Sequence, residues 1–300
     1  MDTPPLLSVV IPSHGRPGPL RAALRALLQS DCPREVFELI VVDDASPGVL
    51  ESQVSAEVEP ARVRWVRLAE NAGPAEARNE GARAARGTYL LFIDDDCLAD
   101  RRWVSRMRAA LEARPGAAVG GRVVDGSGGS LLCAADQWIL DVAYAHYNAD
   151  PERAQFFATL NLAVPADGFR EMGGFDPTYR TAEDREFCAR WLASGRRLAC
   201  APDALVTHAA ASSLGRFWRR HYAFGEGAYR FRSRHTRVAG RHVALEPPGF
   251  YRRLVWAPFT RGVGLNAAAI AALIVVSQAA SALGFAAAWR RDHTSKGRSA

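Results

Sequence analysis

The sequence is short of lysine and of paired cysteines, and both shortages narrow the classes of protein it can encode. Lys296 is the only lysine, so the formal net charge of +6 rests on arginine. The five cysteines are odd in number, widely scattered and never spaced as Cys-x-x-Cys. This pattern argues against a structural zinc site and against a disulfide framework. We therefore expect a protein of a reducing compartment.

Other common features are missing as well. The first residues lack the charged-then-apolar pattern of a signal peptide, and no segment repeats along the chain. With 48% hydrophobic and 23% charged residues, the composition is ordinary for a globular protein. A length of 300 residues allows one large domain or two small ones. The basic pI of about 9.4 favours acidic partners such as nucleotide phosphates, anionic lipids or nucleic acid.

Short apolar runs alternate with helical patterns through the N-terminal part of the chain. Strands are predicted at residues 6–12, 37–42, 62–68, 89–93 and 117–124, and helices at residues 17–30, 75–86 and 101–114. Farther along, residues 156–164, 198–201 and 204–207 are predicted as strands and 183–193 as a helix. The alternation is typical of an α/β fold with a mainly parallel sheet and helices on both faces.

Two groups of carboxylates follow predicted strands. Asp43 and Asp44 end the second strand, and Asp94, Asp95 and Asp96 end the fourth. Ligands of such sheets bind beyond the carboxyl ends of the strands, so both groups are expected at the binding edge. Three adjacent carboxylates repel one another unless a cation lies among them, and oxygen ligands suit Mg²⁺ or Mn²⁺. The simpler alternatives are a solvated acidic turn for the three aspartates and a turn-forming role for the other two.

Three further polar sites are candidates, each with an ordinary structural explanation beside it. Arg78 follows the tight loop at residues 71–74, where it can face a phosphate, pair with a loop carboxylate or remain in solvent. Glu183 and Asp184 open a later helix. A carboxylate there can take the proton of a sugar hydroxyl, or simply favour the helix dipole. His208 follows a short strand and can bind a metal or serve only structurally.

Taken in order, these motifs resemble those of the family 2 glycosyltransferases, which have the GT-A fold. The matching segments are residues 8–13 (SVVIPS), 41–46 (VVDDAS), 71–79 (NAGPAEARN), 91–97 (LFIDDDC) and 173–176 (GGFD), followed by Glu183-Asp184 and His208. The likeness covers about residues 6–210. It implies a Rossmann-like sheet of GT-A type that binds a nucleotide-sugar donor.

The resemblance also implies a role for each matching residue. The donor would be bordered by Pro12, Asp43, Asp44, Gly73, Pro74, Arg78, Asp94 and Asp95, with Asp44 rather than Asp43 on the base. A divalent metal, Mn²⁺ or Mg²⁺, would be held by Asp96, with Asp94 and His208 as further ligands. Asp184 would act as the catalytic base with Glu183 in support. Asn161, Gly173 and Gly174 would lie on the acceptor side.

The reaction that the resemblance implies is a direct displacement that inverts the anomeric carbon. The donor would be a UDP-, GDP- or dTDP-sugar, and the acceptor a hydroxyl of a glycan, a lipid-linked molecule or another compound of cell-envelope polysaccharide synthesis. Processive members carry a Gln-x-x-Arg-Trp motif, whereas residues 216–222 read RFWRRHY. We therefore expect an enzyme that adds one sugar.

The composition changes beyond the catalytic domain, which is expected at residues 1–212. Residues 213–261 are rich in arginine, residues 262–289 carry no charge, and residues 290–300 form a basic tail. The uncharged stretch is long enough to span a hydrocarbon core of about 30 Å or to lie on a membrane. The arginines suit anionic lipids, so we expect membrane association with the catalytic domain on the cytoplasmic side. No nucleic acid partner is expected, because no nucleic-acid-binding motif accompanies the charge.

Two other functions remain as alternatives. A GT-A-like nucleotidyltransferase would carry a glycine-rich basic loop after the first strand, and residues 13–16 (SHGR) match that poorly. A non-catalytic scaffold subunit would show loss of the aspartates at 94–96 or of the Glu183-Asp184 pair, and both are present.

Overall fold

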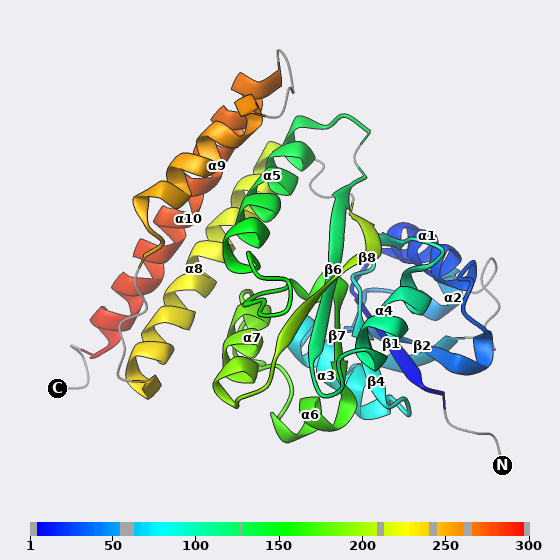
Figure 1. Cartoon of the computed structure of the whole chain (residues 1–300). Helices are drawn as coiled ribbons and strands as arrows, with labels where there is room; N and C mark the ends of the chain where they lie inside the picture. The colour runs from blue at the N-terminus through cyan, green and yellow to red at the C-terminus, as the bar shows by residue number, and fades with distance from the viewer. Residues whose placement is uncertain are drawn as a thin grey trace. The chain divides into compact units, whose positions relative to one another are not determined.

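The computed structural model describes residues 5–54, 63–126, 128–208, 213–239, 245–260 and 266–296. The chain divides into two compact units. The first comprises residues 1–124, 147–178 and 184–208, and the second comprises residues 125–146, 179–183 and 209–300. The first contains a β-sheet with its helices, and the second is helical (Figure 1).

Among the described residues, the first unit holds an eight-stranded sheet in the order β3-β2-β1-β4-β7-β6-β8-β5. The strands are β1 (Leu7–Ser13), β2 (Phe37–Asp43), β3 (Val63–Arg67), β4 (Tyr89–Phe92), β5 (Cys97–Ala99), β6 (Ala118–Asp125), β7 (Leu162–Pro165) and β8 (Leu198–His208). Strands β3, β2, β1 and β4 pair in parallel, whereas β7 is antiparallel to β4 and β6, and β5 is antiparallel to β8. The sheet is therefore mixed, and its parallel half contains the strands that end in carboxylates.

Helices cover both faces of this sheet, and β1 shows why. Successive residues of a strand point to opposite faces. Leu7, Val9 and Ile11 pack in one core with apolar residues of α1 (Pro17–Leu28) and α4 (Trp103–Glu112). Val10 points the other way, toward Gly81 of α3 (Pro74–Ala84). All of β1 is buried, which explains its unbroken apolar run.

Five further helical elements are found among the described residues of this unit, and all but α7 are six residues or shorter. They are η1 (Arg34–Val36), α2 (Leu50–Val54), η3 (Thr159–Asn161), α6 (Ala166–Glu171) and α7 (Glu183–Ala193), whose first residue groups with the second unit.

The structure differs from the predicted elements in several regions, which include helix α5 (Leu131–Tyr147), a helix that the sequence pattern does not predict. The strand predicted at residues 156–164 begins only at Leu162, because Thr159–Asn161 form a 3-10 turn. The two strands predicted at 198–201 and 204–207 are one continuous strand, β8. Strand β5 and helix α6 were not predicted, since elements of three and six residues are too short to show a periodicity.

The second unit contains the long helices α5 (Leu131–Tyr147), α8 (Leu214–Ala239), α9 (Pro248–Thr260) and α10 (Asn266–Lys296). Helices α8 and α9 lie in the arginine-rich segment predicted at 213–261. Helix α10 contains residues 266–289 of the apolar stretch and continues into the predicted tail, whereas residues 262–265 lie outside the described residues. Nearly all of α5 groups with these helices, although the sequence placed it in the catalytic domain of residues 1–212.

Helices α8 and α10 touch through their backbones. A Cβ on Gly225 would lie 1.9 Å from the carbonyl oxygen of Ser281, and a Cβ on Gly284 would lie 2.0 Å from that of Tyr222. The Ser281 hydroxyl also donates to the His221 carbonyl oxygen at 3.0 Å. Such close approach requires glycine at both positions, so the two helices form one packed pair.

The contact between α3 and β1 makes a prediction about stability. A Cβ on Gly81 would lie 2.3 Å from Val10 Cγ1 and 3.1 Å from Val42 Cγ2. We expect Gly81→Ala to destabilise the protein by about 1–3 kcal/mol through overpacking, despite the higher helix propensity of alanine. Denaturant unfolding followed by circular dichroism measures this.

The matched control is Gly18→Ala in α1, where an added Cβ meets nothing within 4 Å. It should be neutral or slightly stabilising. Equal stability of the two variants would contradict the close packing of α3 on β1.

Candidate active site

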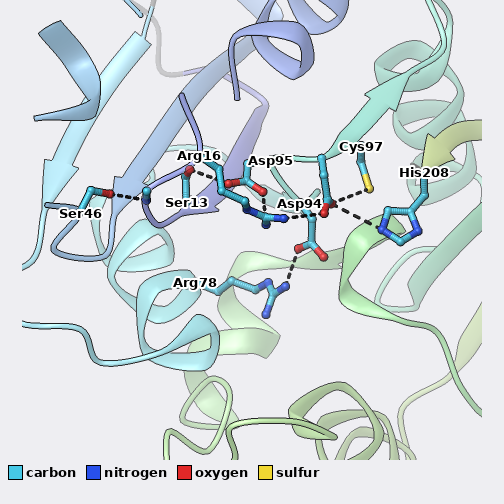
Figure 2. A network of polar contacts seen from close by, with 10 residues as sticks. Ser13, Arg16, Ser46, Arg78, Asp94, Asp95, Cys97 and His208 are labelled. Carbon is cyan, nitrogen blue, oxygen red and sulfur yellow. Dashed lines mark hydrogen bonds and ion pairs between the residues drawn. The ribbon is translucent and has the colours of Figure 1, made fainter. Parts of the chain in front are cut away.

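The three aspartates leave the sheet beside the end of β1. Strand β4 pairs with β1 in parallel, with Phe92 opposite Val10. Residues 94–96 therefore emerge near Ser13, the last residue of β1, whose hydroxyl donates to Asp95 Oδ2 at 2.6 Å. Figure 2 shows these side chains converging at this edge.

Asp95 is the member of the cluster that burial affects most. Its side chain is 0% exposed, and burial raises its pKa to about 7, although Arg16 and Ser13 act to lower it. The Arg16 guanidinium donates through Nη2 to Asp95 Oδ1 and through Nη1 to Asp96 Oδ2, the latter at 2.7 Å. A buried carboxylate requires partners of this kind, because removing its charge from water is costly.

Asp94 has a different counter-ion. Arg78 of α3 donates from Nη2 to Asp94 Oδ1 at 2.5 Å. The arginine side chain is 4% exposed and the aspartate side chain 27% exposed, so the pair is anchored from the protein side. Of the sequence-based alternatives for Arg78, pairing with a loop carboxylate is the one observed.

Asp96 lies beside His208. Antiparallel pairing of β5 with β8 sets Cys97 opposite His208. His208 Nε2 is 3.6 Å from Asp96 Oδ1, and Cys97 Sγ is 3.9 Å from the same oxygen. One ligand atom of each lies within 4.8 Å of the others, a spacing that could hold a metal ion. Burial and the nearby aspartates raise the pKa of the Cys97 thiol well above its ordinary value.

The other group of carboxylates, Asp43 and Asp44, accepts hydrogen bonds from nearby backbone amides. Asp44 accepts hydrogen bonds from the amides of Ala72 and Gly73 at 2.7 and 2.9 Å. Asp43 accepts from the Ser46 amide at 2.9 Å and from the Arg67 guanidinium. Both carboxylates therefore have structural partners. The base-binding role of Asp44 stays a prediction.

Helix α3 and the turn at residues 173–175 are joined by Asn79, which lies in the middle of the helix. Its side-chain oxygen accepts from the Phe175 amide at 2.9 Å, and its amide donates to the Phe175 carbonyl at 2.8 Å. Gly174 has φ +72°, and a Cβ there would lie 2.5 Å from Asn79 Oδ1. Gly173 has φ +74°, so both glycines are required by the backbone of this turn.

The other residues predicted on the donor side lie in β1 and at the start of α3. Pro12 lies in β1 opposite Val42 of β2. Gly73 has φ +89° as the residue before α3, and Pro74 is the first residue of that helix. Proline suits this position because the first helical N–H has no partner within the helix.

Asn161, predicted on the acceptor side, is fully buried. Its Oδ1 accepts from Trp103 Nε1 at 2.8 Å, and its Nδ2 donates to the carbonyls of Arg122 and Ala204 at 3.0 Å. These contacts support a framework role, and the acceptor-side role is a prediction that they do not support. A polar residue in an apolar run also fits a satisfied core amide.

Asp184 and Glu183 form the first turn of α7. Glu183 is buried, whereas Asp184 is partly exposed and its Oδ1 accepts from the Arg185 amide at 2.7 Å. Their catalytic roles stay predictions.

Sequence reasoning missed Ser13 and Arg16 as members of the site. A signal was available: both follow the first strand at the same edge as the aspartates at 94–96.

The geometry agrees with comparisons to known proteins. The family model for glycosyl transferase family 2 matches residues 8–170. The chain therefore belongs to glycosyl transferase family 2, a family of transferase enzymes, as its motifs indicated. This assignment removes support from the nucleotidyltransferase alternative.

Two curated relatives and two solved structures are informative. The chain is 28% identical to the pre-mycofactocin glycosyltransferase of Mycobacterium tuberculosis over 74% of its own length and 46% of that protein. It is 31% identical to validoxylamine A glucosyltransferase of Streptomyces hygroscopicus over 64% of its length and 52% of that protein. The chain thus spans about half the length of these relatives.

The solved structures share the fold. The mannosyltransferase PcManGT of Pyrobaculum calidifontis, in complex with GDP-Man and Mn²⁺, has a TM-score of 0.65 at 21% identity. The match covers 97% of this chain and 80% of the PcManGT chain. S. aureus TarS 1-349 in complex with UDP-GlcNAc has a TM-score of 0.55 at 15% identity, and the match covers 93% of this chain and 89% of the TarS chain. The predicted GT-A fold is confirmed.

The raised pKa of Asp95 predicts how stability depends on pH. An ordinary aspartate titrates near pH 4, whereas Asp95 in the folded protein has a pKa of about 7. Between these values the folded state keeps a proton that the unfolded state releases, so the contribution of Asp95 is full below about pH 4 and is lost as the pH rises to about 7. The loss amounts to at most about 4 kcal/mol.

Asp95→Asn should flatten this part of the profile, because asparagine does not titrate. Urea unfolding in EDTA at several pH values, for wild type and variant, gives the difference. Parallel profiles for the two proteins would show that Asp95 is ionised throughout the range.

Proposed function

We propose that the protein is an inverting glycosyltransferase that moves one sugar from a nucleoside diphosphate sugar to an acceptor hydroxyl with the help of a divalent metal. The observation that carries this proposal is the convergence of the aspartates at 94–96 and His208 at the edge where the parallel strands end. Ligands of such sheets bind at this edge.

The residues present fit a divalent cation. Asp96 and His208 offer a carboxylate oxygen and an imidazole nitrogen 3.6 Å apart, and both side chains are about one fifth exposed. Carboxylate and imidazole together suit Mn²⁺, and carboxylate oxygens suit Mg²⁺. Asp96 and His208 would hold the ion, with Asp94 on its donor side. A bound metal would neutralise the charge that develops on the diphosphate leaving group.

The chain's own residues supply the rest of the chemistry. Asp184 takes the proton of the acceptor hydroxyl as its oxygen forms a bond to the anomeric carbon. The bond from that carbon to the diphosphate breaks on the opposite face, so the configuration inverts. Arg78 holds Asp94 in one orientation from the protein interior. A partly exposed carboxylate such as Asp184 can exchange its proton with solvent after each turnover.

The donor class finds support in the structures that share the fold, since one of them was solved with GDP-Man and another with UDP-GlcNAc. We propose a UDP-, GDP- or dTDP-sugar for this chain. The acceptor is a hydroxyl of a glycan or lipid-linked molecule, and the absence of the Gln-x-x-Arg-Trp motif favours a single addition.

Two substitutions should separate the steps of this reaction. Asp184→Asn removes the base but not the donor site, so we expect transfer to fall about 100-fold or more with nucleotide affinity nearly unchanged. Asp96→Ala should weaken Mn²⁺ and nucleotide binding together. Calorimetry with UDP, GDP and dTDP, with and without Mn²⁺, measures binding, and release of nucleoside diphosphate measures turnover.

Each residue has its own refuting result. Loss of nucleotide binding in Asp184→Asn would show that this carboxylate is part of the donor site. Unchanged Mn²⁺-dependent binding in Asp96→Ala would remove the metal assignment. Absence of binding by the folded wild type to every nucleotide would favour a non-catalytic scaffold subunit.

We also infer that the helical unit lies on the cytoplasmic surface of a membrane and does not span it. Residues 266–294 of α10 are long and apolar enough to cross a bilayer, and one third of the most apolar window is buried. However, α10 is packed backbone to backbone on α8. Helix α8 carries arginines at positions 216, 219, 220, 230, 232 and 234. Each arginine side chain placed at the centre of a bilayer would cost about 2.5–3.5 kcal/mol. Helix α8 therefore cannot cross the membrane beside α10.

Helix α9 offers a face suited to the interface. Trp256 and Phe259 are 59% and 48% exposed, with ring centroids 5.6 Å apart. Arg252 lies one turn before Trp256 on the same face, and Arg253 beside it is also exposed. Leu254 points inward to the helical core. Aromatic side chains next to exposed arginines are typical of helices that lie among anionic headgroups.

This placement predicts how the protein binds vesicles. Wild type should float with vesicles that contain phosphatidylglycerol and much less with pure phosphatidylcholine. Trp256→Ser with Phe259→Ser should reduce flotation about 10-fold or more. The control is Val49→Ser, which removes an exposed apolar side chain from the first unit.

High salt or alkaline carbonate should release wild type from membranes, as expected for a surface-bound protein. Retention under carbonate would instead indicate a spanning helix. Equal flotation of both serine variants would show that α9 does not contact lipid.

A further inference from the structure

Arg16 occupies the position from which a cation would neutralise the aspartate cluster. Its guanidinium reaches over the cluster from the loop after β1 (Figure 2). It bridges Asp95, whose side chain is 0% exposed, and Asp96, whose side chain is 21% exposed. The Arg16 side chain itself is 49% exposed. One end of this ion pair is therefore fixed in the protein and the other is accessible to solvent.

Arg16 and the proposed metal use the same carboxylate. Asp96 Oδ2 accepts from Arg16 Nη1 at 2.7 Å, which leaves Oδ1 on the side of His208. A divalent ion on Asp96 would stand within a few ångströms of the guanidinium, and like charges at that distance repel strongly when partly buried. Binding of the metal and pairing of Arg16 with Asp96 therefore oppose each other.

The loop backbone is fixed, so only the side chain can respond. The Gly15 amide donates to Ser46 Oγ at 2.8 Å, and His14 Nδ1 is 2.6 Å from the carbonyl oxygen of Asp44. Pro17 begins α1 directly after Arg16. A long, half-exposed side chain on a fixed backbone can leave the carboxylates without moving the loop.

We propose that Arg16 is an exchangeable counter-ion that couples metal binding to nucleotide binding: it neutralises Asp95 and Asp96 in the free protein and moves to the diphosphate of the donor when the metal takes its place. The inference rests on the proposed function, because it requires the metal and the donor at this edge. A guanidinium suits the exchange, since it binds carboxylate and phosphate oxygens with the same planar fork.

The coupling has a direct thermodynamic consequence. Metal alone must displace Arg16 without giving it a new partner, whereas metal with nucleotide supplies one. Each ligand therefore tightens the other, and by reciprocity the two coupling factors are equal. Removing the guanidinium should strengthen the binding of Mn²⁺ alone, and it should reduce the factor by which nucleotide tightens Mn²⁺ binding.

The test measures Mn²⁺ binding to Arg16→Gln and to wild type from the electron paramagnetic resonance signal of free Mn²⁺, with no nucleotide present. We expect the variant to bind Mn²⁺ alone about 10-fold tighter than wild type. A second titration adds whichever of UDP, GDP or dTDP wild type binds. There the factor by which nucleotide tightens Mn²⁺ binding should shrink about 10-fold.

The matched control is Arg86→Gln. Arg86 is an exposed arginine that pairs with Glu38 and lies just before β4, away from the carboxyl ends of the strands. It changes the net charge by the same amount and should leave both titrations unchanged. If Arg16→Gln binds Mn²⁺ alone no tighter than this control, the exchange does not occur.

Arg16→Gln can be compared only if it folds, and the residue that threatens its folding is Asp95, because the buried carboxylate of Asp95 loses its counter-ion in this variant. The pair Asp95→Asn and Asp95→Asn with Arg16→Gln avoids this, since Asp96 remains in both. The double variant should again bind Mn²⁺ alone more tightly than the single one, and equal affinity would overturn the proposal. If wild type binds no Mn²⁺ with any nucleotide, the proposed function fails first and the exchange with it.

Discussion

The need to neutralise a buried carboxylate at the end of β4 shapes the whole donor side of this protein. Asp95 is held inside the fold, and its partners Ser13 and Arg16 come from β1 and the loop after it. That loop is fixed in turn by the contact of the Gly15 amide with Ser46. A charge that belongs to one strand therefore determines the conformation of the loop after its neighbour.

The contacts continue around the site and return to the aspartates. The Ser46 amide donates to Asp43, and the adjacent Asp44 binds the amides that precede α3. Helix α3 then presents Arg78 to Asp94, the residue just before Asp95. The result is a closed series of contacts in which each carboxylate has a basic or N–H partner. Such a preorganised set can receive a charged ligand without rebuilding its backbone.

How far the sequence could predict this depends on where each contact originates. Strands β1, β2 and β4 are short and mostly apolar, so their order of appearance and the carboxylates that follow β2 and β4 could be recognised from pattern alone. The meeting of Asp96 with His208 could not, because it depends on β5, a strand of three residues paired with β8. Only the family resemblance indicated it. Asn161 shows where the pattern is ambiguous, since a polar residue near a motif fits an acceptor-side role and also fits a buried amide that binds Trp103 and two carbonyls, which are the contacts observed.

The basic charge of the second unit is not all available to an acidic partner. Several arginines have partners within the unit: Arg220 pairs with Asp136, and Arg291 pairs with Glu226. Arg230 and Arg234 lie against the ring of Tyr179, in the segment that leads into α7. These side chains therefore contribute to packing within the second unit. Under the proposed placement on a membrane surface, lipid binding should depend more on the exposed arginines of α9 beside Trp256 than on the arginines that pair within the unit.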